Sequence, residues 1–159
     1  MRWGKAMQPL DWALLPFNRY FDFSGRSSRA EYWFFTAFIW FVSLLIVAAQ
    51  QILGEAVESV LTIVNGLLGL VTFIPSLAVA VRRLHDINRS GLVLLKYIIA
   101  ATIIAVLMPA GMYFGGFGGG LLLLAAVVLA LKYLILMVSE GDPGPNPYGP
   151  NPYGLTYGY

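Results

Sequence analysis

The chain has 159 residues, of which 58% are hydrophobic and only 11% are charged, whereas soluble domains carry roughly 25% charged residues. Its formal net charge of +2 is too small to argue for nucleic acid, so we expect no nucleic-acid partner. The sequence has no cysteine and one histidine, which excludes thiolate chemistry and a multi-histidine metal site within one chain. We therefore expect no metal and no cofactor.

The N-terminal arm, residues 1–31, mixes polar and apolar side chains. Its large apolar residues recur at roughly helical spacing: Leu10, Trp12, Leu14, Leu15, Phe17, Tyr20 and Phe21. This pattern fits a short helix that lies in the headgroup layer with its aromatic rings at the interface. An irregular arm packed on the rest of the protein is an equally good interpretation.

A first membrane span is expected over residues 32–52, which contain no charge. Ser28 followed by Glu31 predicts a capping box at the start of this helix, in which each side chain accepts from a free backbone N–H. About 20 residues at 1.5 Å each match the ~30 Å hydrocarbon core.

A second uncharged run predicts a span over residues 60–81. Pro75 should kink it, which a membrane helix tolerates when a neighbouring group bonds the carbonyl that proline leaves free. The polar hinge RRLHDINRSG follows at residues 82–91, and Asn88 or Ser90 is expected to cap the next helix.

The apolar stretch of 47 residues from 92 to 138 must fold back, because one straight helix of that length would extend about 70 Å. We expect spans over 92–108 and 120–138, with Pro109 and a run of glycines marking the turn. Gly111, Gly115 and Gly119 are spaced by four and can also let two helices approach closely. With so many glycines together, we favour the flexible turn.

The tail, residues 139–159, contains GPNPY twice, at 144–148 and 149–153. This density of proline and glycine predicts an extended or turn-rich segment. Together these elements predict an all-α membrane protein with four transmembrane helices, an N-terminal interfacial segment and a Pro/Gly-rich tail.

The basic residues predict the orientation of these spans. The arm holds five lysines and arginines and the hinge holds three, whereas the two turns on the opposite side hold none. By the positive-inside rule, both termini and the hinge are expected in the cytoplasm.

The hinge is the candidate functional segment. Its simplest interpretation is a charged turn that anchors two helices at the headgroups. A site for anionic headgroups is the alternative, because guanidinium groups match phosphate geometry and basic clusters beside a membrane attract acidic lipid. A catalytic pair of His85 and Asp86 is disfavoured, because adjacent residues rarely face each other and no nucleophile is evident.

Three segments resemble the signatures of a known family: FDFSGRSSRAEYW at 21–33, PSLAVAVRRLHDINRSG at 75–91 and GDPGPNPYGPNP at 141–152. They are similar to the bacterial inner-membrane proteins grouped as domain of unknown function 805, the YhaH type. Leu92 and Val93 depart from it, since aromatic residues are usual there, and the second GPNPY extends the tail. The resemblance implies a four-helix protein of the bacterial cytoplasmic membrane without an established activity.

Because all three signatures are expected on the cytoplasmic side, we expect their polar residues to form one cluster that holds the helix ends together and turns surplus arginine toward anionic headgroups. The cluster comprises Arg26, Arg29, Glu31, Arg82, Arg83, His85, Asp86, Arg89, Asp142 and Asn146. The expected function is a scaffold or accessory subunit, not an enzyme, whose partners are anionic lipids and a larger complex or a second copy. The alternatives are a transporter or channel component and a membrane enzyme acting on a lipid or phosphate substrate.

Overall fold

A computed structural model describes residues 7–113 and 116–153. Over these residues the protein has five α-helices and no strand, in the order α1 (Pro9–Asn18), α2 (Arg29–Leu53), α3 (Glu55–Asp86), α4 (Leu92–Tyr113) and α5 (Gly116–Val138). The last four of these are long and apolar enough to span a membrane. The expected all-α class with four long apolar helices is therefore confirmed.

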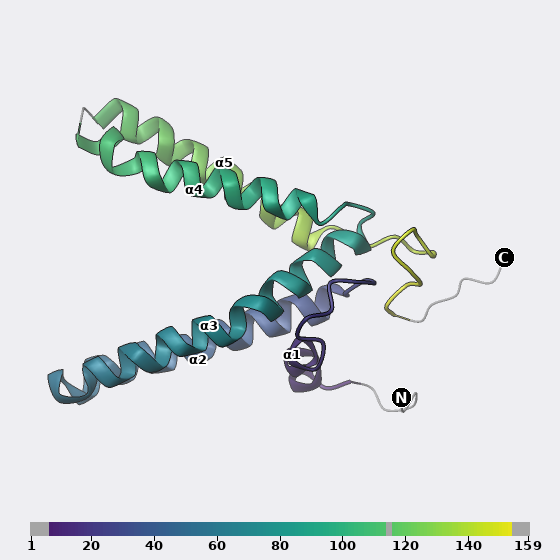
Figure 1. The fold of residues 1–159 in the computed structure, drawn as a ribbon, viewed down its shortest axis with the longest axis horizontal. Coiled ribbons are helices and arrows are strands. Elements are labelled where there is room, and N and C mark those ends of the chain that lie inside the picture. Colours follow the sequence, from purple (N-terminus) through teal and green to yellow (C-terminus); the bar gives the residue numbers. More distant parts are fainter. Residues whose placement is uncertain (1–6, 114–115, 154–159) are drawn as a thin grey trace.

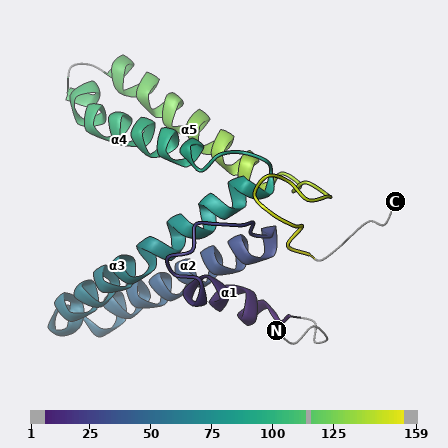
Figure 2. The ribbon, with the colours of Figure 1, turned by 45° about the vertical axis from the view of Figure 1, so that its right-hand side comes forward.

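The long helices form two antiparallel hairpins, α2–α3 and α4–α5, which meet at one end and diverge toward the other (Figure 1). Figure 2 shows the same opening from a second direction. We call the end where the hairpins meet, built from residues 22–31, 82–91 and 137–149, the polar end. The space between the diverging hairpins is called the wedge.

Within the N-terminal arm, residues 9–18 fold as helix α1, as the helical spacing predicts, and this helix packs on the rest of the protein. Its position in the headgroup layer stays a prediction. The backbone N–H of Gln8 donates to Asp11 Oδ2 at 2.9 Å and closes the first turn. Ala13 and Pro16 are buried, and the ring of Phe17 meets Phe35 of α2 edge-on at 5.4 Å. Helix α1 therefore packs across the α2–α3 hairpin.

Only half of the expected capping box forms at the start of α2. The hydroxyl of Ser28 accepts from the backbone N–H of Glu31 at 3.1 Å. The carboxylate of Glu31 does not return to Ser28 but accepts from Arg82 Nη2 at 2.7 Å. A charged guanidinium is a stronger donor than a neutral amide, so it displaces the local bond.

Helix α3 continues through Pro75, and the carbonyl that this proline leaves free has a partner. Proline at position 75 removes the donor that would bond the carbonyl of Val71, four residues earlier. The hydroxyl of Tyr20, in the segment after α1, donates to that carbonyl at 2.7 Å. The N-terminal arm therefore supplies the hydrogen bond that α3 lacks at Pro75.

Helices α4 and α5 extend further than the sequence suggests, to Tyr113 and back to Gly116. The expectation of a flexible turn from Pro109 to Gly120 is wrong for the described residues, because Pro109, Gly111, Gly118 and Gly119 lie within helices. A Cβ on Gly111 would lie 3.1 Å from the backbone nitrogen of Gly119. These glycines allow close helix packing, the interpretation that the sequence disfavoured.

Candidate functional site: a buried charge network

The polar end brings together the segment before α2, the end of α3 and the tail. Ser27 donates its backbone N–H to the Arg82 carbonyl at 3.1 Å, and Asp142 donates its own to the Asp86 carbonyl at 2.9 Å. Two distant parts of the chain thus bond to backbone carbonyls in the last two turns of α3, and the Asp86 carbonyl is one that has no partner within the helix.

Arg82 is 0% exposed and directs its guanidinium toward the N-terminal segment. It donates from Nε to the hydroxyl of Ser27 at 2.9 Å and from Nη2 to Glu31 Oε1 at 2.7 Å. Its Nη1 donates to the backbone carbonyl of Asp22. One side chain therefore ties α3 to the loop after α1 and to the first turn of α2.

Asp86 lies between two arginines from different segments. Its Oδ1 accepts from Arg26 Nε at 2.9 Å and forms an ion pair with Arg26 Nη2, also at 2.9 Å, and its Oδ2 accepts from Arg83. Arg83 also donates from Nε to the Met137 carbonyl at the end of α5, at 3.1 Å. Asp86 therefore couples the N-terminal segment to both hairpins.

The tail completes the coordination of these arginines with backbone carbonyls. Arg26 donates to the carbonyl of Asp142 at 2.6 Å and to that of Gly144 at 2.7 Å. Arg83 donates to the carbonyl of Ser139. Gly141 passes so close that a Cβ there would lie 2.1 Å from Asp86 Oδ2, so this position requires glycine.

We call five of these side chains the charge network: Arg26, Glu31, Arg82, Arg83 and Asp86. All five are at most 5% exposed. Three cations face two anions, and backbone carbonyls take the remaining guanidinium donors. Within the described part of the chain, no buried side-chain nitrogen or oxygen lacks a hydrogen-bond partner. Such complete pairing is what makes buried charge tolerable.

His85 belongs to the packing of the tail rather than to the charge network. Tyr148 stacks on its imidazole with ring centroids 3.9 Å apart and an interplanar angle of 5°. The His85 Nδ1 atom lies 3.0 Å from the carbonyl oxygen of Gly25, and Asn146 donates to the His85 carbonyl at 2.9 Å. Asp86 points to the arginines, so the structure shows no His85–Asp86 pair.

The structure leaves two expected site residues at the surface. Arg29 is half-exposed and lies 3.7 Å from Glu140, which is itself exposed. Arg89 is exposed, and its side chain forms no hydrogen bond or ion pair with the described residues. The sequence also missed Ser27 and Tyr148, because a serine or tyrosine in a polar loop gives no signal of the side chain on which it will pack.

Beside the network lies a polar recess of about 400 Å³, lined by Arg29, Asp86, Glu140, Gly141, Asp142, Pro143, Asn151 and Tyr153. His85 is not part of its lining. Among the described residues, no group of three or more His, Cys, Asp or Glu side chains is arranged to hold a metal ion.

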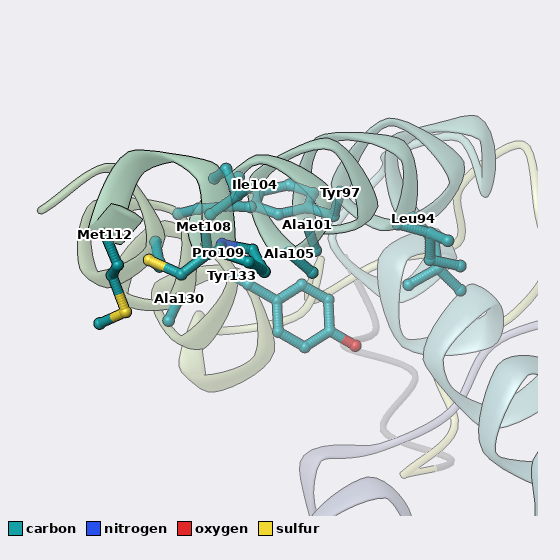
Figure 3. Close-up of a pocket in the computed structure, with 13 residues that line it drawn as sticks. Leu94, Tyr97, Ala101, Ile104, Ala105, Met108, Pro109, Met112, Ala130 and Tyr133 are labelled. Atoms are coloured by element: carbon teal, nitrogen blue, oxygen red, sulfur yellow. The ribbon is translucent and has the colours of Figure 1, made fainter. Parts of the chain in front are cut away.

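An apolar groove of about 760 Å³ runs along α4 and α5 (Figure 3). Leu94, Ile98 and Tyr133 also line a second pocket of about 330 Å³, together with Phe35 of α2 and Val79 of α3. Because that second pocket lies where the hairpins meet, the groove opens into the wedge. Four alanines line the groove at a spacing of four on each helix: Ala101, Ala105, Ala126 and Ala130.

Comparison with known proteins supports one family. Residues 20–150 match the family described as "Protein of unknown function (DUF805)". The "Inner membrane protein YhaI" of Escherichia coli K12 is 44% identical over 82 residues, which is 52% of this chain and 66% of that protein. The chain thus spans slightly less than two thirds of YhaI.

Two further Escherichia coli K12 proteins are similar. "Inner membrane protein YhaH" is 35% identical over 85 residues, 52% of this chain and 68% of that protein. "Uncharacterized protein YiiR" is 28% identical over 141 residues, 86% of this chain and 90% of that protein. No solved structure matches the chain.

Proposed function

Because this chain belongs to the DUF805 family of inner-membrane proteins, we propose that it is a non-catalytic scaffold or accessory subunit of the bacterial cytoplasmic membrane. The observation that carries the proposal is the charge network. Arg82 and Arg83 are 0% exposed and Asp86 is 1% exposed, so these groups are positioned to hold three chain segments together rather than to reach a substrate. The most polar residues of the chain therefore serve its architecture.

The wedge supplies the interaction surface of such a subunit. The charge network fixes the two hairpins at one end, and the apolar groove runs along α4 and α5 next to the second pocket, which α2 and α3 also line. In a membrane, small residues at a spacing of four let a second helix approach closely, and α4 and α5 each present such a pair of alanines. The occupant that we propose is a transmembrane helix of a partner membrane protein.

Photocrosslinking tests this assignment in native membranes. A photoreactive phenylalanine analogue at Ala105, inside the groove, should give one discrete crosslinked protein. The matched control is Ile103, two residues away and therefore about 200° around the helix. Crosslinks to lipid alone at Ala105, a crosslink between two copies of this chain, or equal protein crosslinking at Ile103 would each contradict the proposal.

We also propose that both termini and the hinge face the cytoplasm, as the distribution of lysine and arginine favours. The chain contains no cysteine, so single cysteines can be introduced without background labelling. A cysteine at Ser90 should be protected from a membrane-impermeant maleimide in intact spheroplasts, and one at Glu58 should react. The reverse pattern would invert the proposed orientation.

On that side, the proposed contact with anionic headgroups falls to surface cations. Arg26, Arg82 and Arg83 are buried and saturated by protein partners, whereas Arg29 and Arg89 remain accessible. Basic residues beside a membrane attract acidic lipid over about a Debye length. The charge network is thus structural, and the headgroup contact is peripheral.

Neither alternative function gains a specific observation. A membrane enzyme working through His85 would need that imidazole in a pocket, but Tyr148 covers it and the polar recess does not include it. A transport path would need polar or ionisable groups along the spans, whereas the groove between the hairpins is lined almost wholly by apolar side chains.

A further inference from the structure

Two lysines lie inside the spans of the α4–α5 hairpin at the same depth. Lys96 is four residues from the start of α4 and Lys132 is six residues from the end of α5, which places them about 6 Å and about 9 Å from the polar end of each helix. Each lysine is followed in the sequence by a tyrosine, and the ring centroids of Tyr97 and Tyr133 are 5.4 Å apart. Lys96 and Lys132 therefore lie at a similar depth along the hairpin.

Neither lysine has an acidic partner among the described residues, and both are exposed. The carboxylates of the polar end have other partners: Asp22 pairs with Arg19, Glu31 with Arg82, Asp86 with Arg26 and Arg83, and Glu140 with Arg29, whereas Asp142 accepts from Asn146. Two ammonium groups inside the spans therefore lack a counter-ion from the protein. In a membrane such a charge extends toward the interface to meet water or a phosphate.

The two lysines also share a face of the hairpin. Lys96 is two residues from Ile98 and Lys132 is two residues from Ala130, and two residues correspond to about 200° around a helix. Ile98 and Ala130 both line the apolar groove. The lysines therefore lie on the side of α4 and α5 that faces away from the wedge.

From this placement, we propose that Lys96 and Lys132 form a binding site for an anionic phospholipid on the outer face of the α4–α5 hairpin. The lipid phosphate lies between the two ammonium groups, and its acyl chains follow the apolar surface of the helices. A phospholipid fits this site better than a free phosphate ion, because its acyl chains also cover the apolar surface of the two helices beside the lysines. The inference deepens the proposed headgroup contact and rests on that part of the proposed function.

Native mass spectrometry of the full chain in detergent tests the site. Phosphatidylglycerol and phosphatidylcholine with identical acyl chains are titrated, and the ratio of their dissociation constants is measured. Wild type should bind phosphatidylglycerol more tightly than phosphatidylcholine. In the double variant Lys96→Met with Lys132→Met, the ratio of the two dissociation constants should fall roughly fivefold for each lysine removed. The double variant Lys96→Arg with Lys132→Arg should keep the wild-type ratio. Methionine preserves the apolar stem, so an unchanged unfolding temperature is expected.

Three results would overturn the proposal. The first is an unchanged lipid preference in the double methionine variant or in both single variants. The second is wild type binding inorganic phosphate as tightly as phosphatidylglycerol. The third is a preference for phosphatidylglycerol that disappears in Arg89→Gln but survives in the lysine variants. That result would rule out the lysine site and leave the proposed headgroup contact of the surface arginines intact. The crosslink at Ala105 judges the scaffold role independently.

Discussion

The charge network has two parts, because its three arginines bind two different carboxylates. Arg82 bonds to Glu31 and to the N-terminal segment, whereas Arg83 shares Asp86 with Arg26. The sequence indicated which segments would meet, because the positive-inside rule places them on one side. It could not assign the pairs, since pairing depends on the direction in which α3 presents each side chain.

Double-mutant cycles should separate these two parts. We expect Arg82→Met and Glu31→Gln to couple by about 0.5–3 kcal/mol in the free energy of unfolding, because they remove the two ends of one bond. Arg82→Met and Asp86→Asn should be close to additive, because the two residues share no side-chain bond. Equal coupling in both cycles, measured by denaturation in detergent, would contradict the division.

Asp22 makes the stability of the polar end depend on pH. Hydrogen bonds from Ser24, and then from Arg19, lower the pKa of Asp22 from its ordinary 3.8 to about 2. The folded state therefore favours the ionised carboxylate. This contribution is complete above about pH 4 and is lost as the pH falls through 2, when the folded state also takes up the proton.

The variant Asp22→Asn tests that dependence. Its unfolding temperature should lie below that of wild type at pH 6, and the difference should shrink as the pH approaches 2. The carboxylate is 37% exposed, so the effect is expected to be small. A difference that grows toward acid would have the wrong sign.

At the scale of the elements, the sequence predicted the four long helices well and their ends poorly. Uncharged runs of about 20 residues identify spans, but Pro109 and the neighbouring glycines suggested a loop where α4 and α5 continue. Proline and glycine weaken an isolated helix, and close packing between two helices outweighs that preference here. Only a partner helix distinguishes a turn glycine from a contact glycine.

The contact glycines provide a direct test of this packing. In Gly111→Val the new side chain would meet the backbone of α5, since even a Cβ there lies 3.1 Å from Gly119 nitrogen. A Cβ on Gly120 meets nothing within 4 Å. Gly111→Val should therefore lower the unfolding temperature in detergent, and Gly120→Val should not. Equal losses would contradict the assignment of Gly111 as a contact glycine, because valine is a better helix former than glycine at both positions.

The N-terminal arm shows a different limit of sequence reading. The sequence indicated that Pro75 interrupts the hydrogen bonds of its helix and that another group must bond the carbonyl left free. That group is the hydroxyl of Tyr20, which donates to the carbonyl of Val71, 51 positions later in the chain. Nothing local to either residue signals this contact, because it exists only once α1 has packed across the hairpin.

For the whole molecule, the charge network should determine how far the wedge opens. Spin labels on cysteines at Gln51 and Met112, which are exposed near the far ends of α2 and α4, report the separation of the hairpins. Wild type should give one narrow distance distribution. Asp86→Asn should broaden it, because Arg26 and Arg83 lose their shared carboxylate. A control pair at Gln51 and Thr62, within one hairpin, should remain narrow.

The charge network joins residues that are synthesised at different stages of translation. Arg83 leaves the ribosome 56 residues ahead of Ser139, and Arg26 leaves it 118 residues ahead of Gly144. The carbonyls of Ser139 and Gly144 complete the coordination of these two arginines. Until the tail is synthesised, Arg26 and Arg83 have their shared carboxylate, Asp86, but lack the tail carbonyls. We therefore expect the polar end to close only after residues 139–144 have been made, so chains truncated before residue 139 should be degraded faster by membrane proteases than the full chain.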